Sequence, residues 1–169
     1  PVMCEPTQEL LKRTAENEVD LAIITRVVEA PRAVPFRRER LLWVASDRHR
    51  VHEEAVVPLA LGRPQCGWRA AALQALDTVG RPHRIVFASW NASVVGQAVM
   101  EGLALSVLPE AALRPGMRVL TDADWFPSLP DSEIALIRAS SEPPPAALRL
   151  ERHILDALDN MGARRLAAE

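Results

Sequence analysis

Three polar residues, Ser89, Asn91 and Ser93, follow a run typical of a strand and lead into a run typical of a helix. Side chains of these types cap the first turn of a helix, whose leading N–H groups have no partner inside the helix. A helix start also carries the positive end of the helix dipole, so it attracts a small anion or a carbonyl group. The sequence therefore predicts either a simple helix cap or a small-ligand site at this turn.

The residues around this turn form one strand–helix–strand unit over residues 84–109. β-Branched and aromatic residues at 85–87 predict the first strand, and helix formers follow the polar turn. Gly102 stands where a left-handed C-cap is needed, and alternating apolar residues at 103–107 predict the second strand.

A second strand–helix–strand unit is predicted near the start of the chain. Residues 1–5 and 19–25 predict strands on either side of a helix that begins at Thr7. The nearly continuous apolar character of residues 19–25 favours a parallel sheet covered on both faces. Prolines and arginines interrupt any periodicity over residues 26–40, which predicts an extended crossover without regular structure.

The other predicted elements complete an alternating α/β pattern. Strands are predicted at 41–46, 57–61, 117–120 and 133–138, and helices at 66–79 and 146–160. The last helix carries one apolar stripe, which predicts a buried face.

Composition and charge restrict the class of protein. The chain is 49% hydrophobic and 25% charged, which is typical of a soluble globular protein. The net charge of −2 argues against nucleic-acid binding by this segment itself. Because neither an apolar run of membrane-spanning length nor a secretory signal is found, we predict a cytoplasmic protein without membrane contact.

Residues that could hold a metal or perform catalysis form no recognisable pattern. The two cysteines have no CxxC spacing, and the four histidines form neither a metal site nor a triad: Cys4, Cys66, His49, His52, His83 and His153. We therefore expect no catalytic residues, no metal and no cofactor.

Several motifs resemble the effector-binding domain of LysR-type transcriptional regulators. Residues 94–109 resemble the family's helix and "GLG" strand, with Ala104 in place of the second glycine. Glu5-Pro6-Thr7 is similar to its Glu-x-Ser/Thr motif, and residues 19–23 are similar to its "LDLAI" strand. His49-Arg50-Val51 stands where the family has His-Pro-Leu, so the proline is missing. The resemblance spans residues 1–160.

The resemblance implies a type 2 periplasmic-binding-protein fold: two Rossmann-like α/β lobes joined by two crossovers, with a ligand cleft between them. The first lobe would comprise residues 1–24 and 141–160, and would be truncated because the family's first strand and helix would precede Pro1. The second lobe would comprise residues 30–136. The crossovers would be 25–29 and 137–140, and residues 161–169 would be a tail.

The function that the resemblance implies is sensing of a small effector by a regulatory domain that is not an enzyme. The predicted helix N-terminus together with Arg69 favours an anionic effector. DNA binding would belong to an N-terminal winged helix-turn-helix that is not in this chain, and the protein would form homodimers or homotetramers. Ligands of α/β units bind beyond the carboxyl ends of strands. On that basis, the predicted effector-binding residues are Thr7, Thr25, Cys66, Trp68, Arg69, Ser89, Trp90, Asn91 and Ser93.

Three alternatives stay open at this point. A redox sensor would use Cys4 and Cys66, because a thiol at a helix N-terminus is more reactive. An enzyme similar to prephenate dehydratase is a second alternative, since Thr25-Arg26-Val27 resembles its Thr-Arg-Phe motif with valine in place of phenylalanine. A transport receptor of the same fold is the third.

Overall fold

The computed structural model describes residues 1–27 and 30–161. Contacts divide the chain into two compact units: residues 1–39 with those from Ser132 onward, and residues 40–131. These boundaries differ from the predicted crossovers at 25–29 and 137–140, and the assignment of the units to the two predicted lobes stays a prediction. Residues 28–29 of the first crossover and 162–169 of the predicted tail lie outside the described residues.

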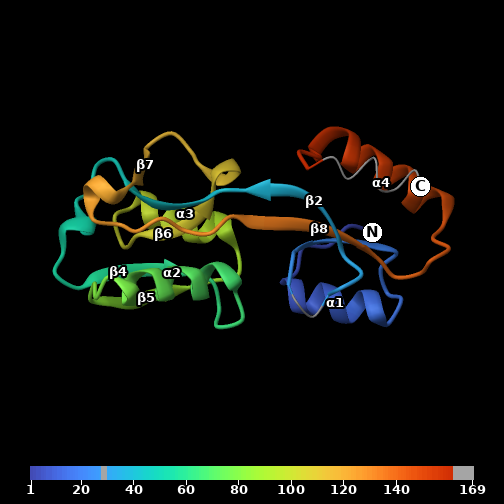
Figure 1. The fold of residues 1–169 in the computed structure, drawn as a ribbon, viewed down its shortest axis with the longest axis horizontal. Helices are drawn as coiled ribbons and strands as arrows, with labels where there is room; N and C mark the ends of the chain where they lie inside the picture. Colours follow the sequence, from blue (N-terminus) through green and yellow to red (C-terminus); the bar gives the residue numbers. More distant parts are fainter. Residues whose placement is uncertain (28–29, 162–169) are drawn as a thin grey trace. The chain divides into compact units, whose positions relative to one another are not determined.

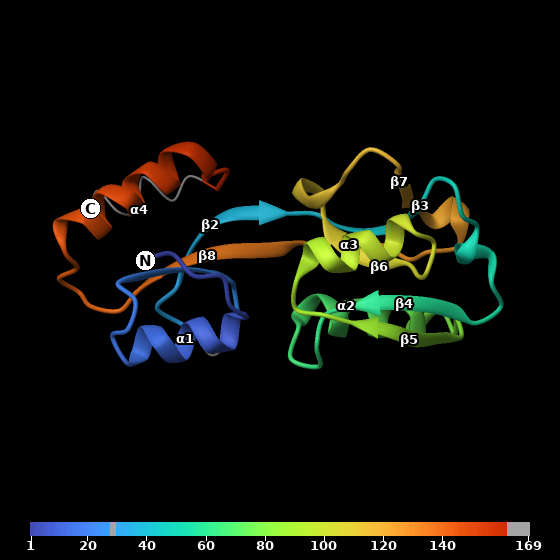
Figure 2. The ribbon, with the colours of Figure 1, turned by 180° about the vertical axis from the view of Figure 1, so that it is seen from behind.

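The first unit is a three-stranded sheet with one helix on each face (Figures 1 and 2). Its strands, in the order β1-β8-β2, are Leu21–Thr25, Ser132–Arg138 and Val34–Glu39, and its helices are α1 (Thr7–Ala15) and α4 (Pro145–Leu158). Ala135 and Ile137 of β8 belong to the core cluster that includes Leu10 of α1. Leu136, which points the other way, packs with Leu155 of α4. The period-2 alternation of a strand thus explains why β8 is apolar on both sides.

Three predictions for the first unit are wrong. β8 pairs antiparallel with both β1 and β2, so the predicted parallel sheet does not form. The apolar run at 21–25 does not reflect burial of both faces, because Ala22 and Ile24 are buried whereas Ile23 is 41% exposed. Residues 1–5 form no strand, although all of them are described, and β2 occupies part of the crossover expected at 26–40.

The second unit contains five strands, two helices and three short 3₁₀ turns. In chain order they are β3 (Leu41–Ser46), η1 (Val51–Glu53), β4 (Val57–Leu61), α2 (Gly67–Thr78), β5 (His83–Ala88), α3 (Ala92–Met100), β6 (Ser106–Pro109), η2 (Glu110–Ala112), β7 (Met117–Leu120) and η3 (Asp122–Asp124). These positions confirm the predicted helices at 66–79 and after Asn91. The strand expected from residue 103 begins instead at Ser106, and the side chain of Leu103 is exposed.

The strands of this unit form one mixed arrangement. β4 and β5 are parallel, whereas β3 pairs antiparallel with β6 on one side and β7 on the other. A parallel bridge between Leu59 and Leu105 joins the two sets, with Ala60 N donating to Leu105 O at 2.7 Å. β5 and β6, the two strands of the predicted central unit, are therefore separated by β4.

Helices α2 and α3 cover different core clusters of this unit. Trp43 and Ala45 of β3 pack in the cluster with Leu76 of α2. Val44, between them in sequence, packs with Val99 of α3. Figure 2 shows α2 beside β4 and β5, with α3 beside β6. The alternation along β3 thus places one residue set against each helix.

Gly102 ends α3 in the left-handed conformation that the sequence predicts, with φ +69°. Its N–H donates to Val99 O at 2.9 Å, and Leu103 N donates to Ala98 O at 3.0 Å. This hydrogen-bond pair is a Schellman motif, which favours glycine because glycine lacks a Cβ.

We expect Gly102→Ala to lower the free energy of unfolding by about 2 kcal/mol, since a left-handed residue with a Cβ is strained. A Cβ there would also collide with the His49 ring. Urea denaturation measures the change. Gly67→Ala is the control, because Gly67 begins α2 with open space around its Cα. Equal stabilities of the two variants would contradict the prediction.

Candidate functional site

The carboxyl ends of β4 and β5 bring two helix starts to one edge of the second unit. Leu61 and Ala88 are register partners at the ends of these parallel strands. The backbone N–H of Ser89 donates to Leu61 O at 3.1 Å, so the next residues of both chain segments lie side by side. α2 begins at Gly67 and α3 at Ala92, each a few residues beyond its strand. Helix starts at such an edge favour small anions.

The start of α3 is capped as the sequence predicts. Asn91 Oδ1 accepts a hydrogen bond from Ser93 N at 2.9 Å, and Ser89 Oγ accepts one from Asn91 N at 3.1 Å. The backbone of Asn91 is extended, as an N-cap requires. Trp90, between the two capping residues, leaves 45% of its surface exposed. The turn therefore presents an indole beside a helix N-terminus.

The start of α2 is closely packed rather than capped by a side chain. Cys66 is the N-cap residue but makes no capping hydrogen bond, and its thiol lies against Gly62. Arg69 Nη1 donates to Gly62 O at 3.2 Å, which holds the guanidinium over the loop between β4 and α2. The ring of Trp68 packs against the core cluster below α2. Arg69 is therefore the cation that the structure holds at this edge, whereas Trp68 has a packing role.

The remaining predicted residues belong to the first unit. Thr7 begins α1, and Thr25 ends β1 as the register partner of Ile134. Cys4 is exposed and Cys66 is half-buried, and both are free thiols. The effector-binding roles of Thr7 and Thr25 and the redox role of the two cysteines stay predictions.

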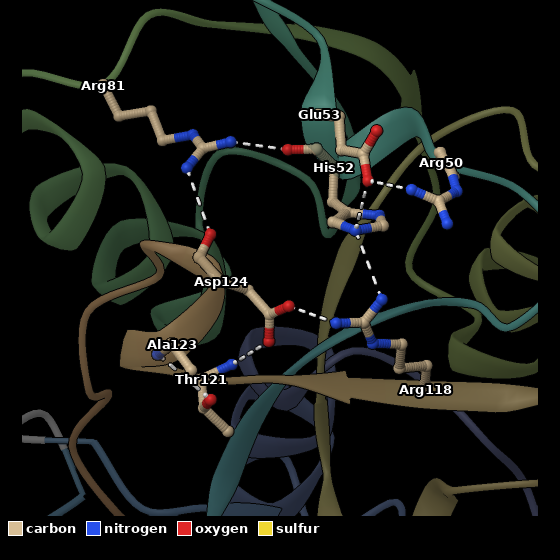
Figure 3. A network of polar contacts seen from close by, with 8 residues as sticks. All are labelled: Arg50, His52, Glu53, Arg81, Arg118, Thr121, Ala123 and Asp124. Atoms are coloured by element: carbon tan, nitrogen blue, oxygen red, sulfur yellow. Dashed lines mark hydrogen bonds and ion pairs between the residues drawn. The ribbon is translucent and has the colours of Figure 1, made fainter.

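A polar network that the sequence analysis missed lies in the second unit (Figure 3). Arg81 Nη2 donates to His52 O at 2.5 Å, and its Nη1 donates to Asp124 O and Trp125 O at 3.4 and 3.1 Å. The same guanidinium lies 4.3 Å from the centre of the Phe126 ring. One arginine therefore connects η1, the start of β5 and the loop after η3.

His52 is the buried histidine of this network, with 6% of its surface exposed. Its Nε2 lies 3.4 Å from Arg118 Nη1 and 3.7 Å from Glu53 Oε1, and Arg118 also pairs with Asp124. Nδ1 is buried without a hydrogen-bond partner among the described residues. Since an arginine can only donate, Nε2 accepts, and the ring is neutral.

Burial, followed by the charge of Arg118, lowers the pKa of His52. In the unfolded chain His52 titrates near pH 6.5, so near and below this pH the unfolded state binds a proton at His52 more readily than the folded state does. We expect the free energy of unfolding to be highest above this pH and to decrease as the pH falls below about 6.5. Urea denaturation between about pH 5 and 8 measures this dependence above the carboxylate titrations.

His52→Gln should flatten the pH dependence in this window, because glutamine does not titrate. His153→Gln is the control, since His153 is exposed on α4 and should leave the slope unchanged. A His52→Gln slope identical to that of the unchanged chain would contradict the assignment.

Two classes of site are not found in the described part of the chain. Residues 1–27 and 30–161 contain no group of three or more His, Cys, Asp or Glu arranged to hold a metal ion. None of their helices has the length and apolarity to cross a membrane.

The network escaped the sequence analysis because its members are far apart in the chain. The signal that was present is Thr121 three residues before Asp124, which is a capping-box spacing. In the structure Thr121 Oγ1 accepts from Ala123 N, and Asp124 Oδ2 accepts from Thr121 N. The left-handed Trp125 and the partners of Arg81 had no local signal.

Comparisons with known proteins agree with this architecture. Residues 2–159 match the family described as LysR substrate binding domain. The HTH-type transcriptional regulator DgdR of Burkholderia cepacia is 29% identical over 135 residues, covering 80% of this chain and 46% of DgdR. The chain thus spans about half the length of this curated relative.

Solved structures show the same fold at low sequence identity. The apo-form regulatory domain of HypT from Salmonella typhimurium has a TM-score of 0.76 at 17% identity, covering 94% of this chain and 83% of that chain. The Synechocystis PCC6803 CcmR regulatory domain, in complex with 2-PG, has a TM-score of 0.68 at 18% identity, covering 92% and 81%. The predicted α/β fold class and the predicted resemblance are confirmed. The chain therefore belongs to the family of LysR substrate-binding domains.

Proposed function

We propose that this chain senses a small anionic metabolite at the carboxyl edge of β4 and β5. The hydrogen bond from Ser89 N to Leu61 O is the observation that carries the proposal, because it fixes the starts of α2 and α3 at one edge. Two helix N-termini and the Arg69 guanidinium would supply N–H donors and positive charge. Ser89, Trp90, Asn91, Ser93 and Cys66 would line this site. Contributions of Thr7, Thr25 and Trp68 are predictions.

The same proposal covers the protein's regulatory role. DgdR is an HTH-type transcriptional regulator, and the CcmR regulatory domain holds 2-PG. We propose that this chain performs no catalysis, acts in the cytoplasm and responds to its effector within a homodimer or homotetramer. DNA contact would come from a winged helix-turn-helix outside this chain. Effector binding would then shift the equilibrium between two states of the assembly.

A thermal-shift titration tests the effector site. The probes are acetate, succinate and salicylate, with the neutral amides acetamide, succinamide and salicylamide as matched controls. A ligand at about 100 times its Kd stabilises the folded protein by about 2.7 kcal/mol. We expect at least one acid to raise the melting temperature in a saturable way and its amide to have no effect.

Two arginine variants make the test specific to this edge. Arg69→Gln should abolish the shift, because it removes the cation held by Gly62 O. Arg63→Gln is the matched control, since Arg63 is exposed in the same loop and should keep the shift. Equal shifts with acids and amides, or an Arg69→Gln variant that responds fully, would overturn the proposal.

A further inference from the structure

A hollow of about 390 Å³ lies at the opposite edge of the same parallel strands. Its lining residues are Glu54, Ala55, Val79, Arg81 and Trp125. Glu54 and Ala55 precede β4, whereas Val79 and Arg81 precede β5. The hollow therefore lies at the amino ends of these strands, away from the candidate effector site at their carboxyl ends. Its volume is in the range of pockets that take small molecules.

Trp125 is held in this hollow at an energetic cost. Its backbone is left-handed at φ +64°, which is unfavourable for a residue with a Cβ, and 81% of its surface is exposed. Burial would instead have stabilised so large an apolar side chain. The Thr121–Asp124 capping box precedes it, and Arg81 Nη1 binds its carbonyl at 3.1 Å. Strained, firmly held conformations of this kind cluster at ligand sites.

The next residue shows that the loop could have buried an aromatic ring. Phe126 is 1% exposed and packs against Trp43, with ring centroids 5.3 Å apart. Phe126 anchors the loop in the core, and Trp125 is thereby turned outward. An exposed indole is suited to stacking against a planar ligand or cation.

The acceptor groups around Trp125 favour a ligand that donates hydrogen bonds. The guanidinium of Arg81 keeps its positive charge, but its N–H groups donate to three carbonyls and its face lies over the Phe126 ring. Glu54 presents a carboxylate that is 44% exposed, and this carboxylate pairs with the exposed Arg84 at 3.5 Å. Such an exposed pair is weak and exchangeable. Val79 is the C-cap of α2, so the negative end of that helix dipole also faces this edge.

We propose that this hollow is a second ligand site, which takes a small planar organic cation of the amidinium or guanidinium type. The cation stacks on the indole of Trp125 and pairs with the carboxylate of Glu54. The site is independent of the effector site proposed above, because it uses none of the same residues.

Benzamidinium is the probe, and the indole N–H signals of the four tryptophans are the readout in ¹H–¹⁵N spectra of this chain. The signal that disappears in Trp125→Phe identifies Trp125. We expect benzamidinium to shift this signal saturably and to leave those of Trp43, Trp68 and Trp90 in place. Glu54→Gln should weaken binding about fivefold or more, since it removes a charge-assisted contact.

The controls separate a cation site from a general aromatic surface. Glu101→Gln, which neutralises an exposed carboxylate beyond α3, should bind benzamidinium with unchanged affinity. Benzamide and benzoate have the same ring without the positive charge, and should bind at least about fivefold more weakly. Equal binding of either compound, unchanged affinity of Glu54→Gln, or no Trp125 shift up to about 10 mM benzamidinium would overturn the proposal.

Discussion

Arg81→Ala is expected to lower the free energy of unfolding by about 3 kcal/mol, because it leaves several carbonyls without a charged donor. These carbonyls belong to His52, Asp124 and Trp125. The variant also removes the cation over the Phe126 ring. Urea denaturation monitored by tryptophan fluorescence measures the loss.

Two further variants test this interpretation of Arg81. Arg48→Ala removes an exposed arginine with a long ion pair of 4.0 Å, and should change stability by less than about 0.5 kcal/mol. Arg81→Lys keeps the charge but not the planar fork, so it should recover only part of the loss. An Arg81→Ala variant as stable as Arg48→Ala would show that the three carbonyls do not depend on this side chain.

Arg138→Ala is expected to destabilise the first unit by about 2 kcal/mol, because it leaves a buried carboxylate without its partner. Arg138 donates from Nε and Nη2 to the two carboxylate oxygens of Glu151, both at 2.7 Å. Glu151 is 8% exposed on the inner side of α4. The 38% exposed Arg138 side chain keeps the effect below that of a fully buried pair.

The matched control is a second arginine–glutamate pair that is open to solvent. Arg40 also donates two hydrogen bonds to one carboxylate, that of Glu110, but both side chains are exposed. Arg40→Ala should therefore leave the urea midpoint nearly unchanged. The double variant Arg138→Leu with Glu151→Leu should regain stability relative to Arg138→Ala, because no unpaired charge remains. A loss of equal size in Arg138→Ala and Arg40→Ala would refute the role of burial.

Features determined by neighbouring residues were predictable from the sequence. Asn91 caps α3 because its side chain reaches an N–H two residues away, and Gly102 ends it because the conformation is local. The edge formed by the ends of β4 and β5 was also predictable, since parallel strands of consecutive units align their carboxyl ends.

Features determined by distant residues were not predictable. The strand direction in the first unit depends on β8, which lies far along the chain: 107 positions separate Arg26 from Glu133, and 95 separate Arg38 from Glu133. Pro35 and the charged residues of β2 are not typical of a strand, so the sequence did not predict β2. It forms a strand because β8 supplies its hydrogen-bond partners. The position of Trp125 depends in the same way on Arg81, which no local pattern relates to it.

The first unit is built from two segments that are far apart in the chain, which has a consequence for synthesis on the ribosome. Residues 40–131 are continuous, so the second unit can collapse as soon as they emerge. β1 and β2 cannot form their sheet until β8, their shared partner, has been synthesised. The ion pair of Arg26 likewise needs Glu133, which is 107 positions later in the chain. We expect β1 and β2 to expose their apolar residues throughout this delay, which makes them a segment that chaperones would bind during synthesis.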